Sequence, residues 1–392
     1  MRMEACAAAI IAACGQSALA QPRFVDVSSE RLPLAATQGR TMDAELADLD
    51  GDGDLDVVLA SEAGQNVILR NDGKGHFSYS AGDIPQGPRR DSEDIAIADF
   101  NGDGRLDIAF ATEDDKIDEL YLQRADDVFG DASDRLPTDG VSNAVIAGDF
   151  NGDERPDLMF GDKGRNRVLL NLGGTGRDWA GFADKSEQVL PNNADRVTQD
   201  LELVDLDGDG SLDLIAGNED GNKLYRWAGE SFEDVTAKWL APLPAEIETR
   251  EADAGDIDGD GDADVVWACV AWRQGADPMN RVLFNSGDGH LADTGAHQLP
   301  LERYFTLDID LADLDGDGDL DMIAGNVNGS PVQVFENDGA GNFKEVSDAW
   351  FETPVAAHVI DVEAADVDGD GDLDLYIANH LGPDWLLINN AG

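Results

Sequence analysis

The stretch DLDGDGDLD at residues 48–56 places five carboxylates and two glycines within nine residues. Two like charges about 4 Å apart repel by roughly 1 kcal/mol in water and by about 4 kcal/mol near a protein surface. The chain already carries 82 acidic against 27 basic residues, a formal net charge of −55, so this crowding needs a compensating cation. The stretch therefore predicts a loop that binds a positive ion.

The motif returns six more times, as DFNGDGRLD at 99, DFNGDERPD at 149, DLDGDGSLD at 205, DIDGDGDAD at 256, DLDGDGDLD at 313 and DVDGDGDLD at 366. We number the repeats 1 to 7 in this order, and their starts lie 50 to 57 residues apart. In the first six repeats an alternating or apolar run precedes the motif and three short runs follow it. Four short strands per repeat predict the blade of a β-propeller.

The two ends of the chain suggest how the repeats close. Repeat 7 stops after its third run, WLLINN at 385–390, whereas FVDVSSERLP at 24–33 matches the fourth runs FEDVTAKWL at 232–240 and FGDASDRLP at 129–137. We therefore predict an all-β fold, a seven-bladed β-propeller of four-stranded blades in which the N-terminal strand completes the last blade. An open solenoid is the alternative, but it would need capping repeats instead of this permutation.

The loop chemistry favours calcium. Oxygens at positions 1, 3, 5 and 9, a backbone carbonyl at position 7 and a turn at the position 6 glycine suit a hard cation with six to eight oxygen ligands, whereas magnesium keeps more of its waters. An EF-hand would need a bidentate Glu at position 12, where this chain has apolar residues such as Leu59 and Trp267. In repeat 3, Glu154 replaces that glycine and Pro156 occupies position 8, which predicts strain and puts this site in doubt.

The predicted calcium ligands, for up to seven ions, occupy positions 1, 3, 5, 7 and 9 of each motif, with position 7 acting through its backbone carbonyl. They are Asp48, Asp50, Asp52, Asp54 and Asp56; Asp99, Asn101, Asp103, Arg105 and Asp107; Asp149, Asn151, Asp153, Arg155 and Asp157; Asp205, Asp207, Asp209, Ser211 and Asp213; Asp256, Asp258, Asp260, Asp262 and Asp264; Asp313, Asp315, Asp317, Asp319 and Asp321; and Asp366, Asp368, Asp370, Asp372 and Asp374.

On these motifs the chain resembles the FG-GAP and VCBS repeat family, whose members look like the seven-bladed ligand-binding head of integrin α subunits. The resemblance extends over residues 24–392. It implies calcium in the loops that join the first and second strands of the blades, with ligands at the positions given above.

The first residues predict export. Residues 1–20 read as a secretory signal peptide with Ala18-Leu19-Ala20 as its cleavage site, and residues 21–392 as a single propeller domain. A lipid anchor at Cys14 is the alternative, and cleavage after Ala20 would leave Cys269 as the only cysteine. We expect a periplasmic, extracellular or cell-surface monomer. The acidic balance disfavours nucleic acid and anionic membranes as partners, and no stretch reaches the ~18 apolar residues of a membrane span.

Charged residues before each motif predict a channel and its mouth. Residues five and three positions before the motif share one side of the first strand, and most are acidic: Asp43, Asp94, Asp200, Glu251, Asp308 and Asp361, with Glu45, Glu202, Asp253, Asp310 and Glu363. Basic residues lie six to ten positions before it: Arg40, Arg90, Arg196, Arg250, Arg303 and His358. We expect polar layers under a basic mouth that holds an anionic group. The competing interpretation is that these charges pair with one another and fix the packing of the blades.

Long loops near repeat 5 supply further candidates for the ligand site. Trp239, Trp272, Arg273, Tyr304 and Trp350 could form a platform for a sugar or peptide, or they could simply cover neighbouring blades. We predict a binding or adhesion module for carbohydrate or protein on the face opposite the calcium loops. The alternative is a lyase or hydrolase acting on acidic glycans at the channel mouth, and a purely structural surface component is the third possibility. HExxH and GxSxG motifs are absent from the sequence, so no catalytic residue is assigned.

Overall fold

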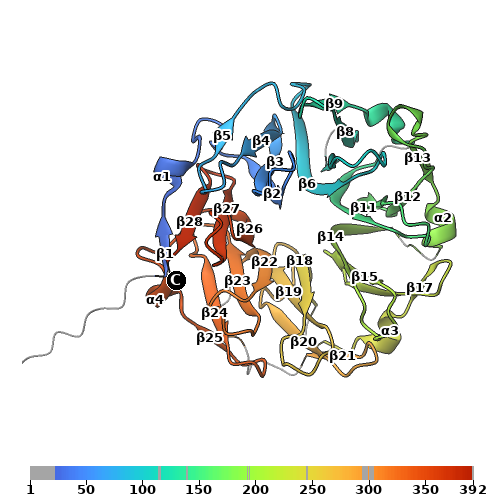
Figure 1. Cartoon of the computed structure of the whole chain (residues 1–392). Coiled ribbons are helices and arrows are strands. Elements are labelled where there is room, and N and C mark those ends of the chain that lie inside the picture. Colours follow the sequence, from blue (N-terminus) through green and yellow to red (C-terminus); the bar gives the residue numbers. More distant parts are fainter. Residues whose placement is uncertain are drawn as a thin grey trace, which may run out of the picture.

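The computed structural model describes residues 23–113, 116–137, 140–191, 193, 195–243, 246–293, 299 and 304–390. The signal peptide predicted at 1–20 and the candidate ligand residue Arg303 lie outside these residues. The described chain is all-β and propeller-like, with sheets arranged around a common centre (Figure 1). None of its helices has the length and apolar character needed to cross a membrane.

Antiparallel strands pair in sets of four. Repeats 1 to 3 contain β2 (Thr41–Ala47), β3 (Asp56–Gly64), β4 (Val67–Arg70) and β5 (Ser78–Tyr79); β6 (Arg90–Ala98), β7 (Asp107–Thr112), β8 (Glu119–Gln123) and β9 (Phe129–Asp131); β10 (Ser142–Gly148), β11 (Asp157–Gly164), β12 (Arg167–Asn171) and β13 (Phe182–Asp184). Repeats 4 to 6 contain β14 (Arg196–Val204), β15 (Asp213–Asn218), β16 (Lys223–Trp227) and β17 (Phe232–Asp234); β18 (Glu248–Gly255), β19 (Asp264–Val270), β20 (Arg281–Asn285) and β21 (Leu291–Asp293); β22 (Thr306–Ala312), β23 (Asp321–Asn326), β24 (Gln333–Asn337) and β25 (Phe343–Glu345).

Repeat 7 takes its fourth strand from the other end of the chain. It contains β26 (Val359–Ala365), β27 (Asp374–Asn379) and β28 (Trp385–Asn389), and β1 (Phe24–Asp26) pairs antiparallel with β28, with Val25 opposite Ile388. Short helices follow several fourth strands: α1 (Ser28–Arg31), α2 (Ser186–Val189), α3 (Thr236–Trp239), α4 (Ser347–Trp350) and the 3-10 turn η1 (Ser133–Arg135). A second 3-10 turn, η2 (Gly176–Asp178), lies between β12 and β13. Two of the sheets contain eight strands, because in each of them two neighbouring sets of four are joined. In one, β3 also pairs with the start of β6, and in the other β11 pairs with the start of β14.

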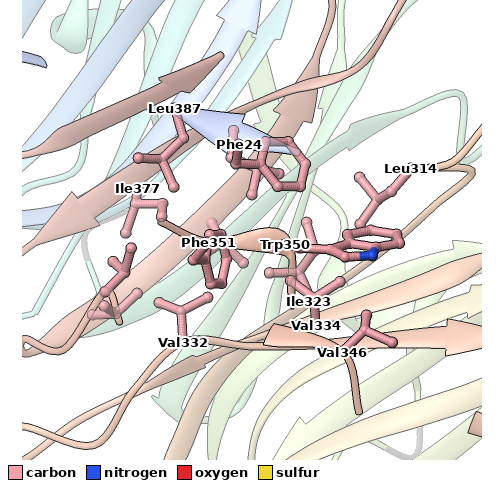
Figure 2. Packing of buried hydrophobic residues seen from close by; sticks show 14 residues of the cluster. Phe24, Leu314, Ile323, Val332, Val334, Val346, Trp350, Phe351, Ile377 and Leu387 are labelled. Atoms are coloured by element: carbon pink, nitrogen blue, oxygen red, sulfur yellow. The ribbon is translucent and has the colours of Figure 1, made fainter. Parts of the chain in front are cut away.

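The hydrophobic core lies between neighbouring sets of strands. The second strand of a set carries apolar residues between its polar ends and is buried on both faces, as in DIAFAT of β7 and DLYIAN of β27. Figure 2 shows one such layer, in which Phe24 of β1 packs with Ile323 of β23 and Leu387 of β28. Phe24 is 1% exposed, and burying a side chain of this kind contributes about 1.5–3 kcal/mol.

Polar side chains at the end of the third strands join each repeat to the one before it. Asn171 donates through Nδ2 to the carbonyl of Phe100, in the preceding repeat, at 2.8 Å. Asn285 bonds the carbonyl of Leu206 in the same way, and Asn337 that of Ile257. Asn71 of repeat 1 donates to Val367 of repeat 7 at 2.8 Å. Because each accepting carbonyl belongs to position 2 of an acidic motif, these bonds connect the loops to the packing of neighbouring repeats.

The first strands carry a shared irregularity. In every repeat the pairing register of the first strand with the second shifts at the same place, for example between Thr41 and Asp43 and between Thr249 and Glu251. Such a β-bulge turns two consecutive side chains toward the same side of the strand. The residues six and five positions before the motif therefore face the centre together, which strict alternation did not predict.

Candidate calcium loops and central cavity

The acidic loops fold around their first aspartate. Asp48 accepts hydrogen bonds from the backbone N–H groups of Gly51 at 2.8 Å, Asp52 at 3.1 Å and Gly53 at 3.0 Å. The loop of repeat 7 repeats this pattern around Asp366. Bonds of this kind curl the backbone so that the side chains at positions 1, 3 and 5 approach one another.

The donor set suits calcium. In repeats 1, 4, 5 and 6, three carboxylate oxygens of the loop lie within 4.8 Å of one another. The Oδ1 atoms of Asp258 and Asp368, both at position 3, are buried and accept no hydrogen bond from a described residue. Buried carboxylate oxygens without a donor are costly, and oxygen is the atom that calcium prefers as a ligand. The loops can therefore hold cations, and calcium would neutralise these carboxylates and fix the turn.

The ninth position has a second role. The Oδ1 of Asp321 accepts the backbone N–H of Asn337 at 2.9 Å, and the aspartates at position 9 of the other repeats accept the equivalent amide of their own third strand. Burial raises the pKa of Asp321 and of Asp374 to about 7. A nearby cation would favour the ionised form again, because opposite charge opposes the effect of desolvation.

Arginines lie close to several loops, and most of these ion pairs were not predicted from the sequence. Arg226 of β16 forms ion pairs with both Asp207 and Asp209 of repeat 4. Four further loops have one such pair each: Arg70 with Asp56, Arg105 with Asp103, Arg155 with Asp153 and Arg31 with Asp368. A basic residue in the otherwise apolar third strand was the available signal for Arg70 and Arg226. These loops are already partly neutralised by the chain itself.

The strain predicted in repeat 3 is present in the backbone. Glu154 has a φ of +65°, whereas the glycines at the same position of the other loops have φ between +86° and +99°. A residue with a Cβ is disfavoured in this left-handed region by roughly 1–2 kcal/mol. Asp149 still accepts the N–H of Glu154 at 2.7 Å, so the loop keeps its turn at that cost.

A cavity of about 860 Å³ opens at the centre, lined by the first strands. Asp43 and Asp94 lie on its wall, as the sequence predicted for residues five positions before the motif. Several of these acids bind the next first strand: Asp361 accepts the N–H of Ala44 at 3.1 Å, Asp200 that of Ala252 at 3.0 Å, and Asp308 that of Val362 at 2.8 Å. The competing interpretation, that the acids fix the packing, is thus right for these residues, but the partners are backbone amides and not basic side chains.

The basic residues predicted to form the mouth of the channel do not form one ring around the cavity. Arg250 and His358 line the cavity, whereas Arg40 pairs with Glu62 at 3.7 Å, Arg90 with Glu119 at 2.9 Å and Arg196 with Asp220 at 3.1 Å. Thirteen carboxylates line the same cavity. An acidic wall disfavours the anionic group expected at the mouth, and that expectation stays a prediction.

The aromatic platform is also corrected in part. Trp239 is 1% exposed and Trp350 is 9% exposed, because α3 and α4 place these rings in the core. Trp350 packs there against Phe24, with ring centres 6.1 Å apart. Trp272 is 50% exposed on the cavity wall, and the Arg250 guanidinium lies 4.3 Å from its ring centre.

Of the other two candidates, Arg273 stays beside Trp272, because Arg273 and Arg250 both bond Glu248 and Glu219, whereas Tyr304 lies away from it. The backbone N–H of Arg273 donates to Glu248 at 2.6 Å. Tyr304 lies beside Pro278 and Phe335, around a small pocket separate from the central cavity.

The cavity carboxylates predict a pH dependence. Burial, followed by the nearby Asp94 for Glu45 and Asp253 for Glu202, raises the pKa of both from 4.5 to about 8. Between these values the folded chain holds protons that the unfolded chain releases, so the free energy of unfolding falls as pH rises. With calcium saturating, we expect it to fall by about 2–3 kcal/mol for each of the two groups between about pH 6 and about pH 9, and the pair Glu45→Gln and Glu202→Gln to reduce that fall.

Urea denaturation across this pH range measures the effect. The exposed pair Glu233→Gln and Glu345→Gln removes the same charge from the outer strands β17 and β25 and should keep the slope. If the free energy of unfolding fell equally steeply with pH in the two double variants, Glu45 and Glu202 would not be the source of the pH dependence.

Comparisons with known proteins agree with this geometry. A model of the FG-GAP-like repeat matches residues 48–110, 99–160, 205–267, 268–324 and 313–377. Cartilage acidic protein 1 of Xenopus tropicalis is 24% identical over 404 residues, covering 94% of this chain and 54% of that protein. The mouse protein of the same name is 26% identical over 206 residues, 48% of this chain and 30% of that protein. The chain thus spans about half, or less, of the length of these relatives.

Solved structures share the fold. BBS1N, solved in complex with ARL6DN, superposes with a TM-score of 0.57 at 14% identity, covering 94% of this chain and 97% of that one. The BP39L lectin from Burkholderia pseudomallei superposes with a TM-score of 0.52 at 15% identity, covering 91% of this chain and 94% of the lectin. At these identities the likeness concerns the fold alone.

Proposed function

Because the chain belongs to the FG-GAP-like repeat family, we propose that it is an exported, calcium-stabilised propeller of seven four-stranded blades that binds a carbohydrate or protein ligand. In this proposal β1 closes the ring by completing the last blade, and calcium occupies the acidic loops with the ligands predicted above. The ligand binds on the face opposite these loops, where the bulged ends of the first strands lie.

The closed ring is supported by contacts between the ends of the chain. β2 contacts both β6 and β26, in the same way as every other first strand contacts its two neighbours. The hydrogen bond from Asn71 to Val367 and the pairing of β1 with β28 also join residues more than 290 positions apart. A closed ring removes the exposed sheet edge that an open solenoid would leave.

The observation that carries the binding role is the half-exposed Trp272. Its ring is held between Arg250 and Phe305, whose ring centre lies 6.4 Å away. Arg250 in turn bonds Gln199 at 2.5 Å and Glu248 at 3.0 Å. A rigid aromatic surface beside fixed polar groups is the usual composition of a site for sugars or proteins. The named lectin neighbour supports a carbohydrate ligand and the named protein complex supports a protein ligand.

A glycan array and a protein array, probed with saturating calcium and again with chelator, test this proposal. We expect a ligand whose binding weakens at least about tenfold in Trp272→Ala, since buried aromatic anchors dominate interfaces. Leu212→Ala is the matched control, because Leu212 is 53% exposed but belongs to the acidic loop of repeat 4. Absence of any ligand on both arrays, or equal loss in the two variants, would refute the binding role at this site.

A further inference from the structure

The central cavity is far more acidic than the packing of the repeats requires. Thirteen carboxylates line it against one arginine, Arg250, and two histidines, His358 and His380. A cavity of about 860 Å³ lies within the range of ordinary small-molecule sites, roughly 300–1,000 Å³. Three of its carboxylates, Asp91, Glu93 and Glu113, lie close enough together to hold a metal ion. An ion with six to eight oxygens in direct contact would fill only a small part of the cavity, so the volume and the charge together favour a cationic organic ligand.

A comparison within one register separates the structural acids from the others. Three positions before the motif, Asp253 accepts the N–H of Leu311 at 2.7 Å and Asp310 that of Ala364 at 2.9 Å, and neither lines the cavity. The longer Glu45, Glu202 and Glu363 occupy the same register and do line it. The longer glutamate side chain thus reaches the cavity. Binding to the next first strand explains the aspartates at this position, but it does not explain these glutamates.

Asp43 supplies a separate sign of an absent partner. It lines the cavity, and its buried Oδ2 atom accepts no hydrogen bond from a backbone N–H or a basic side chain of the described residues, so the only side chain that bonds Asp43 is another acid, Asp94. A buried carboxylate oxygen in this state costs about 1–3 kcal/mol or more unless a donor reaches it. An ammonium group has three donors and no acceptor, and so matches such oxygens without competing acceptors.

The bulged residues divide the cavity wall into an apolar and a polar side. Six positions before the motif, repeats 6, 7 and 1 place Leu307, Ile360 and Met42 on the wall, and their strands β22, β26 and β2 are neighbours. Repeats 2 to 5 place polar side chains at the same position: Glu93, Asn143, Gln199 and Arg250. A ligand that fits both sides has an aliphatic stem and a charged end.

We propose that this cavity binds an alkylammonium group, carried either by a free aliphatic amine or by a lysine side chain of a partner. The methylenes lie against Met42, Leu307 and Ile360, and the ammonium enters among Glu45, Glu202 and Glu363. Trp272 lies on the wall of the same cavity, but this proposal does not rest on the carbohydrate or protein ligand there, because the amine contacts other side chains.

Calorimetric titration of the full chain at saturating calcium tests the proposal with n-hexylamine, its neutral counterpart 1-hexanol, and methylamine. We expect n-hexylamine to bind saturably, at least tenfold more tightly than either of the other two. A peptide with one lysine, compared with its Nε-acetylated form, distinguishes the sources. Binding of the unmodified peptide assigns the site to lysine side chains as well, whereas binding of n-hexylamine alone restricts it to free amines.

Two triple variants complete the test. Glu45→Gln, Glu202→Gln and Glu363→Gln together should weaken n-hexylamine at least tenfold. Glu30→Gln, Glu233→Gln and Glu345→Gln make the same three substitutions at exposed positions and should leave its affinity unchanged. Equal binding of n-hexylamine and 1-hexanol by the native chain, or equal affinity in the two triple variants, would overturn the proposal. The comparison of n-hexylamine with 1-hexanol uses the native chain. It therefore tests the proposal even if the triple variant of Glu45, Glu202 and Glu363 fails to fold.

Discussion

Chelation of calcium is expected to lower the free energy of unfolding by on the order of 10 kcal/mol, if each of seven loops binds at about 10⁻⁴ M and calcium is millimolar. The seven motifs hold 31 acidic residues and two arginines, and their mutual repulsion is left uncompensated when the ions are removed. A loss of this size rivals the whole stability of an ordinary domain. Thermal unfolding with and without excess EDTA measures it, and an unchanged melting temperature would contradict the role of the loops.

The loops should not contribute equally. Arg226 already neutralises Asp207 and Asp209 in repeat 4, whereas among the described residues no arginine pairs with the loop of repeat 5, where the Oδ1 of Asp258 lacks a donor. We therefore expect Asp258→Asn to reduce calcium-dependent stability more than the matched Asp207→Asn. The exposed Asp348→Asn serves as the control for lost charge. A larger effect of Asp207→Asn would show that the arginine does not replace the ion.

Much of this architecture could be predicted from local sequence. The acidic motif fixes a turn through its own aspartates, and the apolar runs beside it form strands that are buried on both faces, so the repeat unit is visible in one dimension. The pairing of β1 with β28 was also predicted, because residues 24–33 have the pattern of a fourth strand.

The cavity wall could not be predicted in the same way. Alternation places Asp43 and Glu45 on one side, but the bulge adds Met42 to that side, and a bulge depends on how the second strand pairs and not on the residue type at the bulge. Likewise, Trp239 and Trp272 are the same residue in two long loops, and only packing decides that α3 buries the first while the second stays half-exposed. Exposure is a property of the neighbours that surround a side chain in space.

Loss of the N-terminal strand is expected to have the second large effect. Phe24 is 1% exposed and packs between the rings of Trp350 and Phe351, with ring centres 6.1 and 5.8 Å away (Figure 2). Truncation of a buried Phe to Ala costs about 3–5 kcal/mol, so Phe24→Ala should lower the free energy of unfolding by that amount. Deletion of residues 23–27 should cost more, because β28 then loses its ladder of backbone hydrogen bonds with β1 as well.

The deletion also exposes a sheet edge. An unpaired strand presents free N–H and C=O groups that pair with other chains, so the shortened protein should associate at concentrations where the full chain does not. Urea denaturation and size-exclusion chromatography measure the two effects. Val25→Thr is the matched control in the same strand, since Val25 is only partly buried and Thr keeps the β-branched shape. If Phe24→Ala were no more destabilising than Val25→Thr, the strand would be an addition to the last sheet and not a part that completes it.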